Sequence, residues 1–316
     1  MAHAASLGES IKIINPEKRF IIGLVDKLDP RIDYSAFSEF ELIPYFDLGY
    51  SEFEDMLSRY NIIEFNTAVK PFYFEYIFQK YPEVDHIYYI DPDIFLYQPI
   101  ESLDHEWGDS EILLTPNLIY LPKATSTGEL ASLRHGINNL GFIGIRSGEE
   151  SFKFIAWWKE RLRFHCKIDK CFGIFVDQKW VDLAPLFFNK IKSVKHPGWN
   201  MAWWNFSERK LLQIGETLYV NSENYKLTFF HFSGFKPGNR LITERMQSEE
   251  FVIQEDHLLQ SLFDDYEKKL FANGFKMLSQ VKPLLNFYKA PDSSWIRLGK
   301  KIKSYSNKII YRLFKV

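Results

Sequence analysis

The chain has 316 residues, a formal net charge of −2 at pH 7 and 46% hydrophobic residues. This length allows one large α/β domain with an appendage or two modest domains, and the apolar share excludes a disordered chain. The near-neutral charge gives no support to nucleic-acid binding. Neither a signal peptide nor an apolar run of about eighteen residues is visible. Cys166 and Cys171 match no zinc pattern, so we expect reduced thiols in a cytoplasmic protein.

Apolar spacing predicts helices alternating with strands over most of the chain. A helix is expected to begin almost at Met1, because Ala4, Leu7, Ile11 and Ile14 share one face. Further helices are predicted over 52–59, 67–81, 151–165 and 177–183, with a loop or short helix over 122–133. Strands are predicted at 20–25, near 42–43, and at 86–90, 111–115, 139–145 and 227–231. This alternation is typical of an α/β fold with a mostly parallel sheet flanked by helices.

The stretch from His86 to Phe95 contains an apolar strand followed directly by Asp91-Pro92-Asp93. Carboxyl ends of strands form the ligand-binding edge of open α/β sheets. Two adjacent carboxylates repel each other unless a cation lies between them, which favours a divalent metal site. An Asp-Pro turn that merely ends a strand explains the same residues about as well.

A second element far downstream, His231-Phe-Ser-Gly-Phe-Lys-Pro237, gives the chain a resemblance to a known group. Together with Asp91-Pro-Asp93, it resembles the glycosyltransferases of the GT-A fold, especially glycosyltransferase family 8 and related bacterial enzymes of surface-polysaccharide synthesis. The family has a metal-binding Asp-x-Asp and a late His-x-x-Gly-x-x-Lys-Pro element. In this chain the late element is one residue shorter between its glycine and its lysine. The resemblance covers roughly residues 3–240.

The resemblance implies a nucleotide-sugar donor held through a metal ion. Asp91, Asp93 and His231 would bind the metal, and the imidazole favours Mn²⁺ over Mg²⁺. The ion would stabilise the charge that grows on the diphosphate leaving group. Lys236 would lie against the diphosphate, and Gly234 would let the backbone approach it closely. A buried histidine satisfied by its neighbours is the structural alternative for His231.

The resemblance also implies further donor and catalytic residues. Asn139, in Asn139-Leu-Gly141, would bind sugar hydroxyls, unless it is only the polar start of a buried strand. Asp177 and Gln178 match the family's Asp-Gln pair beside the donor sugar and are our candidate catalytic residues; Asp177 could instead cap a helix. Lys70 takes the place of a basic donor-binding residue, with an exposed helix lysine as the alternative.

The aromatic segment from Pro197 to Asn200, with Trp203 and Trp204, could form a wall for the acceptor sugar. Core packing explains these rings equally well.

Family members begin with a strand and a loop that receive the nucleotide base, and this first strand is missing ahead of the helix at Met1. We therefore expect a chain whose start has been assigned too late, or a protein that lacks part of the donor pocket. A missing central strand would leave sheet edges unpaired.

The end of the chain differs from the rest in its charge. We predict a transferase domain over 1–248 and a helical region over 249–316. Basic residues dominate 291–316, with apolar residues between them and Asp292 as the single acid. Such a tail is expected to contact an anionic membrane peripherally, although a helix packed on the domain is the alternative.

We therefore expect a metal-dependent glycosyltransferase at the inner face of a bacterial membrane. It would move a sugar from a nucleoside-diphosphate donor, which we expect to be UDP-linked, to a glycan or glycolipid acceptor in surface-polysaccharide or lipopolysaccharide synthesis, with retention of configuration. Two alternatives are a sugar nucleotidyltransferase and a catalytically inactive homologue that serves as a binding or assembly subunit.

Overall fold

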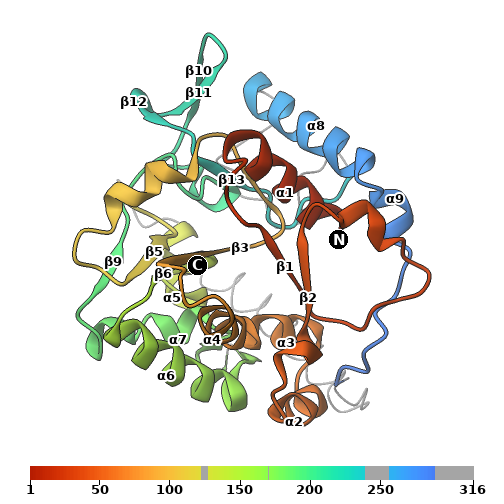
Figure 1. The fold of residues 1–316 in the computed structure, drawn as a ribbon. Coiled ribbons are helices and arrows are strands. Elements are labelled where there is room, and N and C mark those ends of the chain that lie inside the picture. Colours follow the sequence, from red (N-terminus) through yellow and green to blue (C-terminus); the bar gives the residue numbers. More distant parts are fainter. Residues whose placement is uncertain (122–126, 170, 239–255, 289–316) are drawn as a thin grey trace, which may run out of the picture.

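The structure is a computed structural model that describes residues 1–121, 127–169, 171–238 and 256–288. Its helices and strands alternate along the chain, as predicted (Figure 1). The helices are α1 Ala2–Ile14, α2 Glu52–Arg59, α3 Ile62–Ala68, α4 Lys70–Lys80, α5 Thr127–His135, α6 Glu149–His165, α7 Gln178–Val181, α8 His257–Ala272 and α9 Phe275–Leu278. The first strands are β1 Ile21–Leu24, β2 Glu41–Pro44, β3 His86–Ile90, β4 Ile94–Leu96, β5 Ile112–Pro116, β6 Asn138–Arg146 and β7 Ile168–Asp169. The remaining strands are β8 Ile174–Phe175, β9 Ile191–Ser193, β10 Leu211–Ile214, β11 Thr217–Val220, β12 Ser222–Lys226 and β13 Phe229–His231.

The predicted α/β class is confirmed. The strand order and directions define the main sheet more closely. The largest sheet has the order β3-β6-β5-β9. Strands β3 and β5 are both antiparallel to β6, and β5 is parallel to β9. Three of these strands therefore share one direction, and β6 runs against them. A separate parallel pair, β1-β2, lies beside this sheet.

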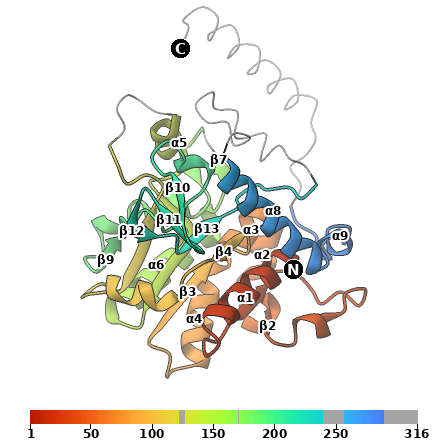
Figure 2. The same cartoon turned by 90° about the horizontal axis from the view of Figure 1, so that it is seen from above.

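Helices cover both faces of the sheet, with α1 and α8 on one side and α4 and α6 on the other (Figures 1 and 2). Side chains of β5 alternate between the two layers, as a strand buried on both faces requires. Leu113 faces the cluster that contains Leu7 and Ile11 of α1. Ile112 and Leu114 face the larger cluster built with α2, α3, α4 and α6. The sheet is thus fixed between two apolar layers, and its strand ends are left to carry polar groups.

Several elements differ from the sequence prediction: strands β4, β7, β8 and β9 were not predicted, and the helix predicted over 177–183 spans only Gln178–Val181. Two further differences have a clear local cause. The single helix predicted over 67–81 is two helices, α3 and α4, with Val69 between them. An Asn61–Glu64 capping box begins α3, which accounts for the early start. The antiparallel ribbon β10-β11-β12 was not predicted, because β12 is polar and mostly exposed and so lacks an apolar pattern.

The C-terminal region is described only in part. Helix α8 lies in the 249–288 segment predicted to be helical, and it packs on α1 and on residues around β13. The division into domains at residue 248 stays a prediction. The predicted membrane-binding tail, 291–316, lies outside the described residues. In the described part of the chain, helices long and apolar enough to span a bilayer are absent.

Candidate metal and donor site

The turn between β3 and β4 carries the Asp-x-Asp, and β13 brings the histidine to it. Strand β4 pairs antiparallel with β13, with Ile94 opposite His231. The Phe232 N–H donates to the Asp93 carbonyl at 2.8 Å, which closes the link. As a result, Asp91, Asp93 and His231 each offer a ligand atom, and these atoms all lie within 4.8 Å of one another. The predicted three-residue cluster is therefore assembled from segments about 140 residues apart in sequence.

The electrostatics of this cluster show mutual stabilisation of opposite charges. The His231 Nε2 lies 3.1 Å from Asp93 Oδ1 and 3.9 Å from Asp91 Oδ2. Burial opposes charge on His231, but Asp93 and Asp91 outweigh it and raise the imidazole pKa. Burial likewise opposes charge on Asp93, yet the His231 imidazole holds the pKa of that carboxyl below its ordinary value. Two carboxylates and one imidazole thus converge in a place that favours a positive charge.

These donors fit a divalent ion. Carboxylate oxygens suit Mg²⁺ and Mn²⁺, whereas imidazole is a softer ligand that fits Mn²⁺ better. Asp91 and Asp93 are partly exposed, with 29% and 28% of their side chains accessible, so an ion and its remaining ligands have access. We therefore regard Asp91, Asp93 and His231 as the residues that would hold a metal, with Mn²⁺ as the best match.

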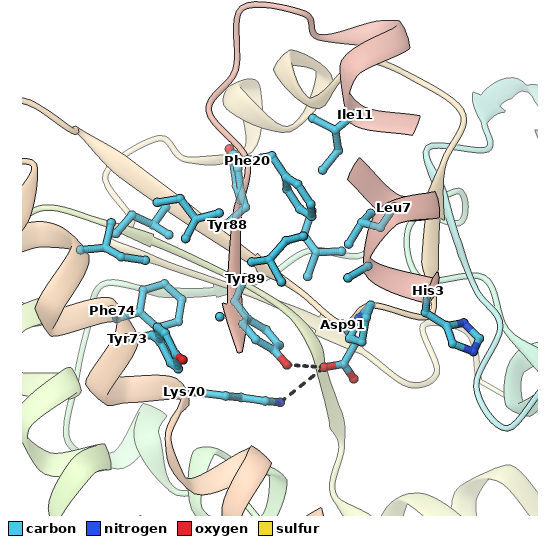
Figure 3. A pocket seen from close by; sticks show the side chains of 18 of the residues that line it. His3, Leu7, Ile11, Phe20, Lys70, Tyr73, Phe74, Tyr88, Tyr89 and Asp91 are labelled. Atoms are coloured by element: carbon cyan, nitrogen blue, oxygen red, sulfur yellow. Dashed lines mark hydrogen bonds and ion pairs between the residues drawn. The ribbon is translucent and has the colours of Figure 1, made fainter. Parts of the chain in front are cut away.

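Asp91 is oriented by two neighbours that leave one of its oxygens available. The Tyr89 hydroxyl donates to Asp91 Oδ1 at 2.6 Å, and Lys70 Nζ lies 3.8 Å from the same oxygen (Figure 3). Burial and the nearby carboxylates raise the Tyr89 pKa, so its hydroxyl keeps the proton that it donates. Oδ2 of Asp91 is left facing His231.

Lys70 is a buried cation rather than an exposed helix lysine. Its side chain is 8% exposed, and Nζ lies 3.0 Å from Asp177 Oδ2 and donates to the Leu140 carbonyl at 2.9 Å. Burial opposes its charge, but Asp177 and Asp91 outweigh burial and raise the Lys70 pKa. For Asp177, burial prevails over the attraction of Lys70 and raises the carboxyl pKa. Lys70 therefore joins the predicted catalytic Asp177 to the metal-site Asp91.

The Asn139-Leu-Gly141 segment packs directly on the histidine. A Cβ added to Gly141 would lie 2.5 Å from His231 Cε1, so only glycine fits there. The Asn139 side-chain oxygen accepts from the Gly141 N–H at 3.0 Å. In this structure Asn139 therefore shapes the strand that supports His231, next to the position predicted for the donor sugar.

The remaining predicted residues lie farther from the cluster or point elsewhere. The side-chain amide of Gln178 is hydrogen-bonded to backbone groups: it donates to the His135 carbonyl at 2.9 Å and accepts from the Leu140 N–H at 3.4 Å. Gly234 has φ +75°, which glycine adopts readily, and it lines the cavity beside the cluster. Lys236 is exposed in the same loop and is not among the residues that line the cavity.

Asn200 is a site residue whose role the sequence did not reveal. It is fully buried, and its Oδ1 lies 3.3 Å from His231 Nδ1. With Nδ1–H donating to that oxygen, Nε2 points at Asp91 and Asp93, and loss of the Nε2 proton would give the tautomer that a metal ligand needs. Asn200 has φ +53°, a conformation that asparagine tolerates better than most residues. The segment had been singled out only for its aromatic rings.

The sequence allowed two roles for the aromatic rings of this segment, core packing or a wall for the acceptor sugar, and the structure places the rings differently. Trp199 is 2% exposed and packs in the core on Phe142 and Phe229, so core packing holds for this ring. Trp204 instead lies edge-on to His231, with ring centroids 5.2 Å apart. Among the described residues, the buried indole N–H groups of Trp203 and Trp204 and the Asn200 side-chain nitrogen lack hydrogen-bond partners. Buried donors of this kind suit a ligand that brings acceptor oxygens.

We expect Asn200→Gly to lower the affinity for Mn²⁺ by about 10- to 100-fold, the usual effect of losing a partner of a metal-binding histidine. Glycine keeps the positive φ, so the loss would come from the missing Oδ1 rather than from the backbone. Isothermal titration with Mn²⁺ measures the effect. Asn221→Gly is the matched control, because Asn221 also has positive φ (66°) but its side chain binds the backbone of Glu208 and Lys210, just ahead of β10. Equal affinities for the Asn200→Gly variant and the unmodified protein would remove Asn200 from the site.

Comparisons with known proteins leave the family open. No protein-family model matches the chain. The uncharacterized protein YfnF of Bacillus subtilis (strain 168) is 26% identical over 174 residues, covering 55% of this chain and 57% of YfnF. The uncharacterized protein YfnD of the same strain is 23% identical over 227 residues, covering 68% of each chain. The match thus spans little more than half of the length of YfnF.

One similar solved structure is that of the galactosyltransferase LgtC in complex with donor and acceptor sugar analogs. It is 13% identical, with a TM-score of 0.49, and the match covers 92% of this chain and 94% of LgtC. A likeness this distant does not define a family. What the structure establishes by itself is an α/β protein with a metal-competent Asp-Asp-His cluster at the carboxyl end of β3.

Proposed function

We propose that the protein is a metal-dependent glycosyltransferase of the GT-A type that uses a nucleoside-diphosphate sugar as donor. The observation that carries the proposal is the cluster of Asp91, Asp93 and His231 at the carboxyl end of β3, the ligand-binding edge of such sheets. Asp91 and Asp93 also line one end of a cavity of about 990 Å³ that runs along β1 and β3. Open α/β folds bind nucleotides at this edge. The cavity volume is within the range of pockets that enclose a small organic ligand.

The residues around the cluster have distinct roles in this proposal. A metal ion bound by the cluster would supply Lewis-acid stabilisation to the diphosphate leaving group. Asn200 holds His231 in the tautomer that binds the ion, and Tyr89 fixes the orientation of Asp91. Lys70 keeps Asp177 in place beside the site, where its carboxylate can accept hydrogen bonds from sugar hydroxyls. Gly234 leaves room for the backbone of the β13 loop to approach the phosphates, and the exposed Lys236 can reach them once the donor is bound.

The finer assignments belong to the proposal too and are supported by the motif resemblance. They are a UDP-linked donor, retention of anomeric configuration and a glycan or glycolipid acceptor in surface-polysaccharide or lipopolysaccharide synthesis. The unpaired donors of Trp203, Trp204 and Asn200 support a polyhydroxylated ligand next to His231. The proposed location is the inner face of the cell membrane.

A donor screen tests the proposal. The protein is incubated with UDP-, GDP- and TDP-sugars in the presence of Mn²⁺, and nucleoside diphosphate release is followed with and without EDTA. We expect release from at least one donor, and EDTA should stop it. Formation of pyrophosphate from a nucleoside triphosphate and a sugar 1-phosphate would instead identify a nucleotidyltransferase.

Direct binding separates an enzyme from an inactive homologue. Mn²⁺-dependent binding of a donor without turnover, with any of the acceptors tried, would favour a binding or assembly subunit. The absence of both binding and hydrolysis across the whole donor panel would refute the proposed function.

A further inference from the structure

Helix α8 lies against the segment that follows the metal-binding histidine. The helix packs on α1 and on the apolar layer around β13 (Figures 1 and 2). Residues 232–238, which we call the β13 loop, follow His231 directly and contain Gly234 and Lys236. In the proposed function this loop approaches the diphosphate of the donor. The contacts that α8 makes with the β13 loop therefore bear on the site itself.

One face of α8 contacts the β13 loop from end to end. Phe263, Tyr266 and Glu267 share this face, because helical residues three and four positions apart are neighbours. The ring of Phe263 lies edge-on to that of Phe232, with centroids 5.1 Å apart. At the other end of the loop, Glu267 accepts a hydrogen bond from the Gly238 N–H. A single helix thus holds both ends of the loop.

Tyr266 makes the closest of these contacts. Its ring stacks on Phe232, with centroids 3.8 Å apart and planes 10° from parallel, and it lies edge-on to Phe95 at 6.2 Å. Phe232 directly follows His231, and Phe95 comes two residues after Asp93. One buried ring, 2% exposed, therefore contacts both of the chain segments that carry these metal-site residues.

The hydroxyl of Tyr266 adds a link to α1. It lies 2.9 Å from Nδ1 of His3. Burial, reinforced by the charge of Asp93, raises the Tyr266 pKa, so the hydroxyl keeps its proton. Burial lowers the His3 pKa, which favours a neutral imidazole that can accept this proton's hydrogen bond at Nδ1. Tyr266 consequently ties α1 to β4 and β13 beside the site.

The strands that carry the cluster need such support. Asp93 and His231 are brought together by the pairing of β4 with β13, which has three residues in each strand and forms a two-stranded sheet of its own. A two-stranded pair is only marginally stable unless it packs on a further layer. Metal sites in turn depend on neighbours that fix the orientation of the binding side chains. The layer that packs on this pair includes α8.

We propose that Tyr266 is a positioning residue of the metal centre, whose ring keeps the segments of Asp93 and His231 in register with each other. Helix α8 then belongs to the site although it lies beyond the predicted domain boundary at residue 248. The inference rests on the proposed function, because that function gives Asp93 and His231 their metal.

Two substitutions of Tyr266 separate its ring from its hydroxyl. Tyr266→Met removes the ring but fills much of its space with a flexible apolar side chain. Tyr266→Leu replaces it if the methionine variant does not fold. Tyr266→Phe keeps the ring and removes only the hydroxyl. Tyr60→Met is the matched control, because Tyr60 is also fully buried and hydrogen-bonded, through the Leu162 carbonyl, but belongs to the other apolar layer.

Two measurements report on the site. Isothermal titration gives the affinity for Mn²⁺. Native-state hydrogen exchange of the metal-free protein is read at the Phe232 amide, which donates to the Asp93 carbonyl at 2.8 Å. The Val194 amide, which donates to the Leu114 carbonyl of the main sheet at the same distance, is the internal reference for changes in overall stability.

We expect Tyr266→Met to lower the affinity for Mn²⁺ by about 10-fold or more, and to speed exchange at Phe232 more than about 10-fold beyond any change at Val194. Tyr266→Phe should stay within about threefold of the unmodified protein in both measurements, because the ring remains. Tyr60→Met should lower Tm without a selective effect on Phe232 or on the affinity for Mn²⁺.

The same selective change in Tyr60→Met, or its absence in Tyr266→Met, would overturn the proposal. The exchange measurement needs neither metal nor donor. If the unmodified protein bound no Mn²⁺, the proposed function would fail, whereas exchange at Phe232 would still decide whether Tyr266 holds the two segments together.

Discussion

Asp93→Asn is expected to lower the affinity for Mn²⁺ by more than about 100-fold, beyond the loss usual for residues that only support a ligand. Asparagine keeps the shape of the side chain but is neutral, and its amide oxygen is a weaker ligand than a carboxylate oxygen. The substitution also removes the charge that lies 3.1 Å from His231 Nε2. Donor hydrolysis should fall with metal affinity.

Metal binding can be followed without any substrate. Trp204 lies 5.2 Å from His231, so paramagnetic Mn²⁺ should quench its fluorescence, and the quenching curve gives the affinity. Asp264→Asn is the matched control, because it makes the same change at an exposed carboxylate of α8. If Asp93→Asn and Asp264→Asn bind Mn²⁺ equally well, the assigned metal centre is wrong.

Much of the fold was predictable because apolar spacing depends on the local sequence. The helix at Met1, the strand from Ile21 and the helix over 52–59 were each predicted from their own residues. The direction of β6 was not, because a buried strand reads the same whether it runs parallel or antiparallel to its neighbours. The break at Val69 was also missed, since the apolar pattern continues through it.

The part of the site that lies in recognisable sequence motifs could be predicted from the sequence. Asp91, Asp93 and His231 were predicted together and lie together. The role of Asn200 was hidden because its contact with His231 joins residues 31 positions apart and depends on a positive φ. The burial of Lys70 was similarly invisible, since a lysine at a helix start is ordinarily exposed. A single sequence gives little information about which distant residues a buried polar group contacts.

Lys70→Met is expected to lower the free energy of unfolding by about 3–5 kcal/mol, the usual effect of breaking a buried ion pair from one side. Methionine fills much of the same space but leaves Asp177, 2% exposed, without its cation. Urea unfolding measures the loss. Lys80→Met is the matched control in the same helix. The Lys80 Nζ lies 2.9 Å from Glu41 Oε1, but the Lys80 side chain is 39% exposed, so the loss in the free energy of unfolding should stay below about 1 kcal/mol.

The pH dependence of the Lys70→Met variant identifies the cause of its instability. Without the ammonium group, burial should raise the Asp177 pKa further above its value in the unfolded chain. The folded variant then holds a proton on Asp177 more tightly than the unfolded chain does, so its deficit should shrink as the pH falls from about 8 to about 5. Adding Asp177→Leu to the variant should recover most of the loss, because no uncompensated charge remains. A deficit that is independent of pH and persists in the double variant would show that Lys70 acts through packing instead.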